Sequence, residues 1–233
     1  EVEPEILREL GLAIEDAYVC WPADCEPLNA DVIAQGIGSQ AADLIPAVEV
    51  LPAVGSTNDW LREQLREGEE PDDERQWQVV TAECQLAGKG RLGRHWRTPV
   101  GGSLALSVAL NLSRPADSLG GLSLVVGLAV LEALDHDGAL QLGLKWPNDI
   151  QAGSSKLGGI LIEMLHSDSA GTRLIIGIGL NYRLPLQVQA GIDKDVTDLH
   201  EVGLQQSRSE ILAAILERLQ DFVAEFERAG FTR

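Results

Sequence analysis

The residues with the clearest chemical potential are 83–97, which read ECQLAGKGRLGRHWR. Glycine lets the backbone approach a ligand closely, and lysine and arginine side chains bind anions through charged hydrogen bonds. The pattern predicts a loop that holds a phosphate or a carboxylate. A solvated basic turn is the alternative that these residues alone leave open. Three glycines are each followed directly by a cation, and a tryptophan comes two residues later: Gly88, Lys89, Gly90, Arg91, Gly93, Arg94 and Trp96.

The same residues also contain the G-x-G-x-x-G spacing of dinucleotide-binding proteins. That fingerprint requires an amphipathic helix that opens within the motif. Residues 95–102 read HWRTPVGG, which has no helical period and contains one proline and two glycines. The sequence therefore predicts a loop between two strands, and we reject the Rossmann interpretation.

Three other short blocks carry side chains that could bind a ligand. Residues 56–58 (STN) begin a predicted helix, residues 145–149 (KWPND) form a predicted turn, and Lys156 opens a predicted strand. Each has a structural alternative when taken alone, namely a helix cap, a plain turn and a surface lysine. Gly177 and Gly179 alternate along a later strand, which leaves a slot for a flat ring or for close packing.

Composition limits the classes of function. The chain has 233 residues, enough for one full core and a partial second domain. It carries 36 Asp and Glu against 18 Lys and Arg, a formal net charge of −18, which argues against nucleic acid as a partner. Its three cysteines form no disulfide or zinc pattern, which is typical of a reducing compartment. No segment resembles a signal peptide or a membrane span, so we expect a cytoplasmic protein.

Periodicity indicates an α/β (α+β) chain with one mixed sheet and helices mostly on one face. Residues 102–112 alternate cleanly between a large apolar face and a small face. Residues 207–210 (SRSE) form a capping box for a long final helix. Residues 68–76 are an expected acidic surface loop. We expect strands at 48–51, 77–84, 102–112, 142–144, 150–151, 156–165 and 174–181, and helices at 4–18, 28–37, 55–66, 118–136, 196–202 and 207–228.

Taken together, the blocks GKGRLGRHW, STN, KWPND and KLGGIL, with GIGLN behind them, resemble biotin protein ligases over about residues 46–230. Four blocks in the family's order make a specific match. The resemblance implies the class II synthetase-like fold of biotin and lipoate protein ligase catalytic domains. It also implies that ATP activates biotin to biotinyl-5′-AMP, with magnesium, before biotin passes to a lysine of a biotin carboxyl carrier protein. A homodimer is a further implication.

The resemblance assigns roles residue by residue. The expected catalytic residues are Lys156, Lys89, Arg91 and Asp149. The expected biotin-binding residues are Ser56, Thr57, Asn58, Gln85, Gly88, Lys89, Gly90, Arg91, Lys156, Gly159 and Gly177. The expected ATP-binding residues are Arg91, Arg94, Trp96, Lys145, Asn148, Lys156 and Asn181. No metal ligand set is expected from the chain itself.

The chain departs from the family pattern in three places. Residues 1–45 are expected to be an extension or the remnant of a winged-helix domain with its linker, followed by a catalytic domain at 46–233. The small SH3-like C-terminal domain of many members is expected to be absent. Lys89 stands where the family usually has arginine. Two rival functions stay open, a lipoate or octanoyl transferase of the same fold and a catalytically inactive biotin-binding regulator.

Overall fold

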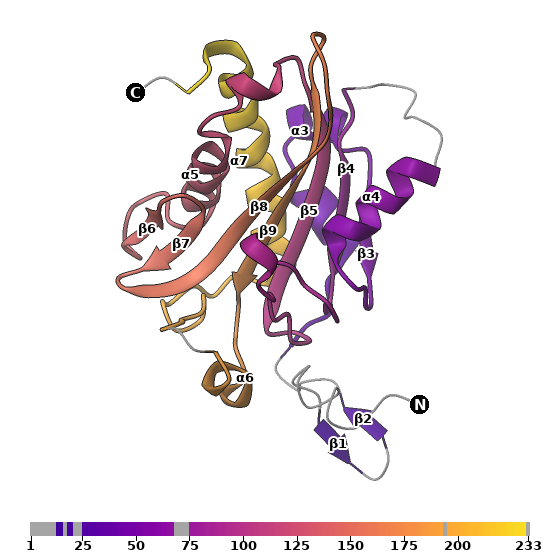
Figure 1. Cartoon of the computed structure of the whole chain (residues 1–233). Helices are drawn as coiled ribbons and strands as arrows, with labels where there is room; N and C mark the ends of the chain where they lie inside the picture. The colour runs from indigo at the N-terminus through magenta and orange to yellow at the C-terminus, as the bar shows by residue number, and fades with distance from the viewer. Residues whose placement is uncertain (1–12, 16–17, 21–24, 68–74, 193–194, 232–233) are drawn as a thin grey trace.

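The structure is a computed structural model, and it describes residues 13–15, 18–20, 25–67, 75–192 and 195–231. A seven-stranded mixed sheet lies at its centre (Figure 1). Its strand order is β3-β4-β5-β9-β8-β7-β6; β3 and β4 run parallel, and the other neighbouring pairs run antiparallel. The strands are β3 (Val48–Leu51), β4 (Gln78–Ala82), β5 (Ser103–Leu112), β6 (Leu142–Lys145), β7 (Asp149–Ala152), β8 (Ser155–Ser167) and β9 (Thr172–Asn181).

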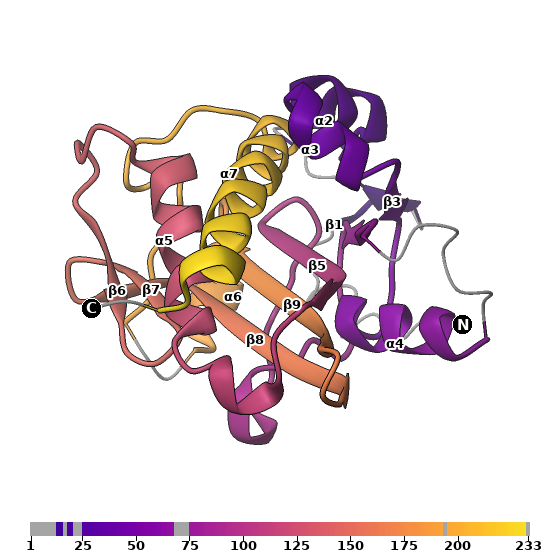
Figure 2. The same cartoon turned by 90° about the horizontal axis from the view of Figure 1, so that it is seen from above.

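One face of the sheet is covered by α5 (Leu122–Leu134) and α7 (Arg208–Ala229), which pack against each other (Figure 2). The large residues of β5, among them Leu104, Leu106 and Val108, belong to the same buried cluster as these helices. This burial explains the period-two pattern, because every second side chain of a strand points to the same face. The prediction that most helices lie on one face is confirmed.

The opposite face carries α4 (Thr57–Glu67), which packs on β4, β5 and β9. A small cluster joins Leu61 of this helix to Val80, Ala109 and Ile175 of the sheet. The small side chains of β5 face this side, as their alternation with the large ones requires. Because α4 covers only part of this face, the remainder is open to form a cavity.

The segment before the sheet shares the main core. Helices α2 (Ala30–Gly36) and α3 (Ser39–Leu44) pack against α7, and Ile33, Ala41 and Ile45 are buried in the same cluster as the sheet. A division at residue 45 therefore does not separate two cores within the described residues. The assignment of residues 1–45 as an extension or the remnant of a winged-helix domain stays a prediction.

Two predicted helices are wrong where the structure describes them. Where a helix was expected over residues 4–18, the structure has strands β1 (Ala13–Glu15) and β2 (Tyr18–Cys20), which pair antiparallel. Residues 1–12 lie outside the described part. β-Branched and aromatic residues such as Ile14, Tyr18 and Val19 favour strands. The helix expected at 196–202 is instead irregular and partly extended, because Thr197 N–H donates to the Lys156 carbonyl and Leu199 N–H donates to the Asn181 carbonyl.

The remaining helices follow local signals. Ser207 and Glu210 form both halves of the predicted capping box at the start of α7. Helix α6 (Leu186–Ala190), which begins directly after Pro185, was not predicted from the sequence. Within the described residues, no helix combines the length and the apolar character needed to cross a membrane. Residues 68–74 of the predicted acidic loop lie outside the description.

Candidate active site

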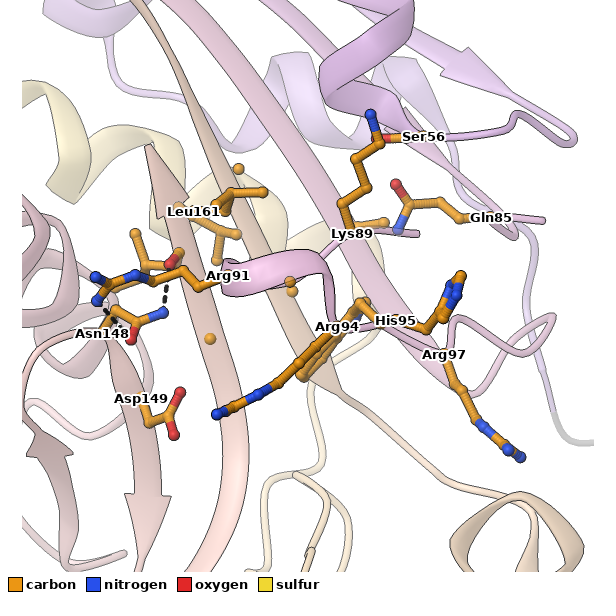
Figure 3. Close-up of a pocket in the computed structure, with 18 of the residues that line it drawn as sticks. Ser56, Gln85, Lys89, Arg91, Arg94, His95, Arg97, Asn148, Asp149 and Leu161 are labelled. Atoms are coloured by element: carbon orange, nitrogen blue, oxygen red, sulfur yellow. Dashed lines mark hydrogen bonds between the residues drawn. The ribbon is translucent and has the colours of Figure 1, made fainter. Parts of the chain in front are cut away.

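A cavity of about 530 Å³ opens beside α4 on the partly covered face of the sheet (Figure 3). Its size suits a small organic ligand. Segments far apart in the sequence meet there, from the start of α4, the loop after β4, and strands β7, β8 and β9. Most of the predicted site residues line it: Ser56, Thr57, Asn58, Gln85, Lys89, Gly90, Arg91, Arg94, Trp96, Asn148, Asp149, Lys156, Gly159, Gly177 and Asn181.

Two predicted residues do not line the cavity. Lys145 has an exposed side chain at the end of β6. Gly88 is buried behind the loop, where a Cβ would overlap the carbonyl oxygen of Trp96. Gly88 therefore shapes the loop by close packing, and the geometry gives no support to a direct contact between Lys145 and a ligand in this cavity.

One end of the cavity is a buried cluster of short polar side chains. The side-chain oxygen of Gln85 accepts from the Thr57 N–H at 2.9 Å, and its amide donates to the Thr98 hydroxyl at 2.9 Å. The Ser107 hydroxyl lies 2.7 Å from the Thr57 hydroxyl and 2.6 Å from the Asn58 side-chain oxygen. Ser56, Thr57, Asn58 and Gln85 are each at most 9% exposed. Such fixed, desolvated donors and acceptors can orient a small polar ring.

Glycines make room for this cluster and for an aromatic ring beside it. A Cβ at Gly177 would lie 2.5 Å from the Asn58 side-chain oxygen, and one at Gly179 would lie 2.6 Å from the Trp96 ring. Gly179 pairs with Gly159 across β8 and β9, so the floor of the cavity has no side chain there. In this structure the predicted slot is filled by side chains of the chain itself.

The loop after β4 is a compact hairpin between two strands, as expected. Gly90 N–H donates to the Arg94 carbonyl at 2.7 Å, and Trp96 N–H donates to the Gly88 carbonyl at 2.8 Å. Its tip, Arg91–Gly93, is a short 3₁₀ turn in which Leu92 has φ of 59° and an 88% exposed side chain. Tight pairing at its base and an exposed tip would allow the loop to move as a unit.

The cations of this loop point in different directions (Figure 3). Lys89 reaches Asp59 on α4, with its ammonium 2.6 Å from the carboxylate. Arg91 donates to the Asn148 side-chain oxygen at 3.3 Å. Together with Arg94, Arg97 and Lys156, they give the lining five Lys and Arg side chains against one carboxylate, Asp149. A local excess of positive charge in a chain of net charge −18 is a strong indication of an anion site.

Lys156 and Asp149 form the charged centre of the far wall. The Lys156 ammonium lies 2.6 Å from the Asp149 carboxylate and 5.6 Å from the centre of the Trp96 ring. Trp96 Nε1 is buried and has no hydrogen-bond partner among the described residues. This nitrogen packs against Gly179, because a Cβ there would lie 2.6 Å from it. Asn181 is already engaged, because its amide donates to the Thr197 carbonyl at 2.9 Å.

Several parts of the site were not predicted from the sequence. Arg97, Ile192 and Val196 line the cavity, and Asp59, Arg62 and Glu163 connect its polar residues from behind. The small face of β5 was the one signal for the Ser107 contact. Nothing in the local sequence around Arg62 or Glu163 indicates their pairing, since they are 101 residues apart.

Two other features limit the chemistry. Burial raises the pKa of the Cys84 thiol, and the neighbouring Glu83 carboxylate raises it further, so this thiol is a poor nucleophile. Within the described ranges, no group of three or more His, Cys, Asp or Glu side chains could hold a metal ion by itself. The site combines a polar neutral cluster at the start of α4 with five cationic side chains, which suits a ligand with a polar ring and an acid group.

Comparisons with known proteins agree with this geometry. The model of the biotin/lipoate A/B protein ligase family matches residues 50–181. The chain is 33% identical to the bifunctional ligase/repressor BirA of Escherichia coli over 79% of its own length and 56% of that protein's, so it spans about half of this relative. It is 33% identical to the biotin–[acetyl-CoA-carboxylase] ligase of Mycobacterium tuberculosis, covering 90% of this chain and 74% of that protein.

A solved structure also matches. The biotin protein ligase of Aquifex aeolicus in complex with biotin and ATP has a TM-score of 0.58 and 29% identity, covering 78% of this chain and 72% of that chain. The expected fold, a mixed sheet flanked by helices, is thereby confirmed. The match of the family model over more than half of the sequence, together with these relatives, establishes that the chain belongs to the biotin/lipoate A/B protein ligase family.

Proposed function

We propose that this chain is a biotin protein ligase that activates biotin with ATP and transfers it to a lysine of a biotin carboxyl carrier protein. The observation that carries the proposal is the composition of the cavity lining, with buried amides and hydroxyls at the start of α4 and five cationic side chains from the loop and from β8. Biotin has a cyclic urea at one end and a carboxylate at the other, which matches this arrangement. The names of the relatives support the same choice.

In the proposed first step, a biotin carboxylate oxygen attacks the α-phosphorus of ATP, and the bond to pyrophosphate breaks. Two anions must approach each other, so electrostatic stabilisation is the main requirement. Lys156, whose ammonium lies 2.6 Å from the Asp149 carboxylate and 5.6 Å from the centre of the Trp96 ring, would contact both groups. Arg91 and Arg94 line the same part of the cavity and would bind phosphate oxygens.

The cluster at the start of α4 would hold the urea ring. Thr57 and Asn58 are buried and fixed by Ser107, and Gln85 is fixed by Thr98. Preorganised partners of this kind hold the far carboxylate within reach of the phosphate. Trp96, which lines the cavity, would contact the nucleotide.

Magnesium is part of the proposal as an ion that enters with ATP. Protein sites commonly bind it through one or two carboxylates together with phosphate oxygens. Asp149 is the one carboxylate among the described lining residues, which fits this mode and does not fit a complete protein cage. The ion would neutralise phosphate charge.

In the second step, the amine of the carrier lysine attacks the acyl carbon of biotinyl-5′-AMP. AMP leaves and the amine loses a proton, which yields the amide. Closing the loop at residues 88–97 over the adenylate would exclude water from this reactive anhydride. A cytoplasmic location, where ATP is abundant, and a homodimer are further parts of the proposal that rest on the family resemblance. Sedimentation of the purified chain tests the dimer.

The decisive experiment is ATP–pyrophosphate exchange with and without biotin. We expect exchange that depends on biotin, and biotin binding in calorimetry that lipoate does not reproduce. Exchange that depends on lipoate would identify a lipoate-activating enzyme of the same family. Biotin binding without exchange would identify a binding protein and would contradict the proposed ligase.

A further inference from the structure

A chain of charged side chains lies directly behind the cavity. Lys89 of the loop contacts Asp59 at 2.6 Å, Asp59 contacts Arg62 at 2.6 Å, and Arg62 contacts Glu163 at 2.5 Å. Glu163 accepts a hydrogen bond from the Asn58 amide at 2.6 Å. The two ends, Lys89 and Asn58, line the cavity, whereas the three middle residues do not.

Arg62 is the central member of this chain. One nitrogen of its guanidinium donates to Asp59 of the same helix, and another donates to Glu163 on β8. Burial lowers the Arg62 pKa, but the hydrogen bonds and negative charges of Glu163 and Asp59 raise it by more, so the net shift is upward. Arg62 is therefore always charged, and its planar fork can hold two carboxylates in a fixed geometry.

Glu163 determines which way the Asn58 amide faces. An ionised carboxylate only accepts hydrogen bonds, so the Asn58 NH₂ group must point to Glu163 and its oxygen must point to Ser107. Gly177 leaves the space that this orientation needs. The polarity that the cavity presents to a ligand at this end is consequently set from outside the cavity.

Asp59 has the matching effect on the loop. It holds the Lys89 ammonium at the α4 side of the cavity, away from the Lys156–Asp149 pair of the far wall. The Lys89 side chain is 47% exposed, so this contact can exchange with a ligand carboxylate. Arg62 pairs with the same Asp59 carboxylate as Lys89. It thereby offsets part of the negative charge of Asp59 and restricts the position of this carboxylate.

We propose that Arg62 is a positioning residue that orients two residues of the ligand site, Asn58 and Lys89. Through Glu163 it fixes the amide that would face the biotin ring, and through Asp59 it fixes the partner of the loop cation that would face the biotin carboxylate. The inference rests on the proposed function, because biotin is the ligand that Asn58 and Lys89 would bind. An ion-pair network that merely stabilises α4 is the competing explanation.

The test compares Arg62→Leu and Arg62→Lys with Arg66→Leu, an exposed arginine one turn further along α4. For Arg62→Leu we expect biotin affinity in calorimetry, and KM for biotin in pyrophosphate exchange, to worsen about tenfold, the scale of one charged hydrogen bond. KM for ATP should change by less than about twofold. Arg62→Lys should restore part of the affinity, because one ammonium can bridge only one carboxylate well. Arg66→Leu should match wild type.

A double-mutant cycle with Glu163→Gln separates positioning from helix stability. If Arg62 acts through Glu163, the double variant should bind biotin no more weakly than the worse single variant. If Arg62→Leu fails to fold, the same comparison of biotin affinity with KM for ATP is made with Glu163→Gln and Arg62→Lys. Equal losses for biotin and ATP, or a loss that follows only the melting temperature, would overturn the inference. Wild type that binds no biotin would instead overturn the proposed function, and the inference with it.

Discussion

At the scale of single residues, Lys156 is the side chain with the most to contribute to the proposed chemistry. Its ammonium lies on the cavity wall next to Asp149 and Trp96. We expect Lys156→Ala to bind biotin within a few-fold of wild type but to lose pyrophosphate exchange by about 100-fold, roughly 3 kcal/mol of transition-state stabilisation. Exchange rates and calorimetry on the same preparation measure both quantities.

Lys145 provides the matched comparison. It is another lysine of a motif block, but it is exposed and does not line the cavity. We expect Lys145→Ala to keep exchange within about twofold of wild type, the range of surface substitutions without a specific contact. A loss as large as that of Lys156→Ala would restore the prediction from the sequence that Lys145 binds ATP. Near-normal exchange in Lys156→Ala would contradict the role proposed for Lys156.

A substitution at Gly177 tests whether the polar cluster at the start of α4 binds the ligand. An added Cβ would lie 2.5 Å from the Asn58 side-chain oxygen, so Asn58 must move and lose its contacts with Ser107 or Glu163. We expect Gly177→Ala to weaken biotin binding at least tenfold and to destabilise the fold by about 1–3 kcal/mol. Calorimetry and urea denaturation measure the two effects.

Gly143→Ala on β6 is the control for this substitution, because nothing lies within 4 Å of its added Cβ. Both biotin affinity and the urea midpoint should stay at wild-type values or rise slightly. Unchanged biotin affinity in Gly177→Ala would show that the orientation of Asn58 is irrelevant to the ligand.

At the scale of elements, the loop at residues 88–97 should respond to ligand. Arg91 and Arg94 are exposed at its tip, where trypsin can reach them. Biotin with ATP would place anionic groups between these side chains and the cavity wall. The open loop that trypsin cleaves would then be less populated, so we expect cleavage there to slow at least about tenfold. Cleavage at Arg228, exposed on α7, is the internal control. Equal slowing at both sites would indicate general stabilisation, and unchanged cleavage in the loop would contradict closure.

A buried ion pair stabilises the start of α7. Arg208 and Glu83 lie 2.7 Å apart with side chains that are 2% and 6% exposed, and Glu83 also accepts from the Leu28 N–H. Removing one partner leaves a buried charge uncompensated. We expect Arg208→Ala to lower the free energy of unfolding by about 3–5 kcal/mol in urea denaturation.

The exposed Arg228–Glu225 pair on the same helix is the comparison, and Arg228→Ala should leave the denaturation midpoint almost unchanged. Replacing both Arg208 and Glu83 by leucine should cost less than Arg208→Ala alone, because no buried charge then remains. A double variant that is clearly less stable than the single one would show that the pair itself stabilises the fold.

At the scale of the whole molecule, the net charge of −18 is the dominant electrostatic feature. Raising salt from about 0.01 M to 0.15 M shortens the Debye length from roughly 30 Å to 8 Å, which screens this self-repulsion. Exposed ion pairs are screened too, but each contributes little. We therefore expect the melting temperature at pH 7 to rise by about 2–4 °C, equivalent to about 1 kcal/mol.

The control for the salt effect is the same measurement at a lower pH. Near pH 4.5, the isoelectric point expected from the composition, net charge vanishes and the same salt step should leave the melting temperature almost unchanged. An equal rise at both pH values would indicate a specific ion site or a general salt effect in place of screened repulsion.

Local patterns in the sequence determined much of the fold. The alternation of large and small residues in β5, the capping box of α7 and the loop character of residues 88–97 all depend on neighbours within a few positions. Short-range sterics and hydrogen bonds decide such features. The motif blocks also identified most of the residues that line the cavity. The helix expected at 196–202 failed because its backbone hydrogen bonds go to Lys156 and Asn181, which no local rule reveals.

Only the tertiary structure decided which of these residues meet. It placed Lys156 on the cavity wall and Lys145 outside it, although both belong to motif blocks. It brought Arg62 to Glu163 across 101 positions and turned Lys89 toward Asp59. Charged contacts of this kind depend on distance and burial after folding, because a side chain's partners are set by which elements pack together and leave no periodic trace in the sequence.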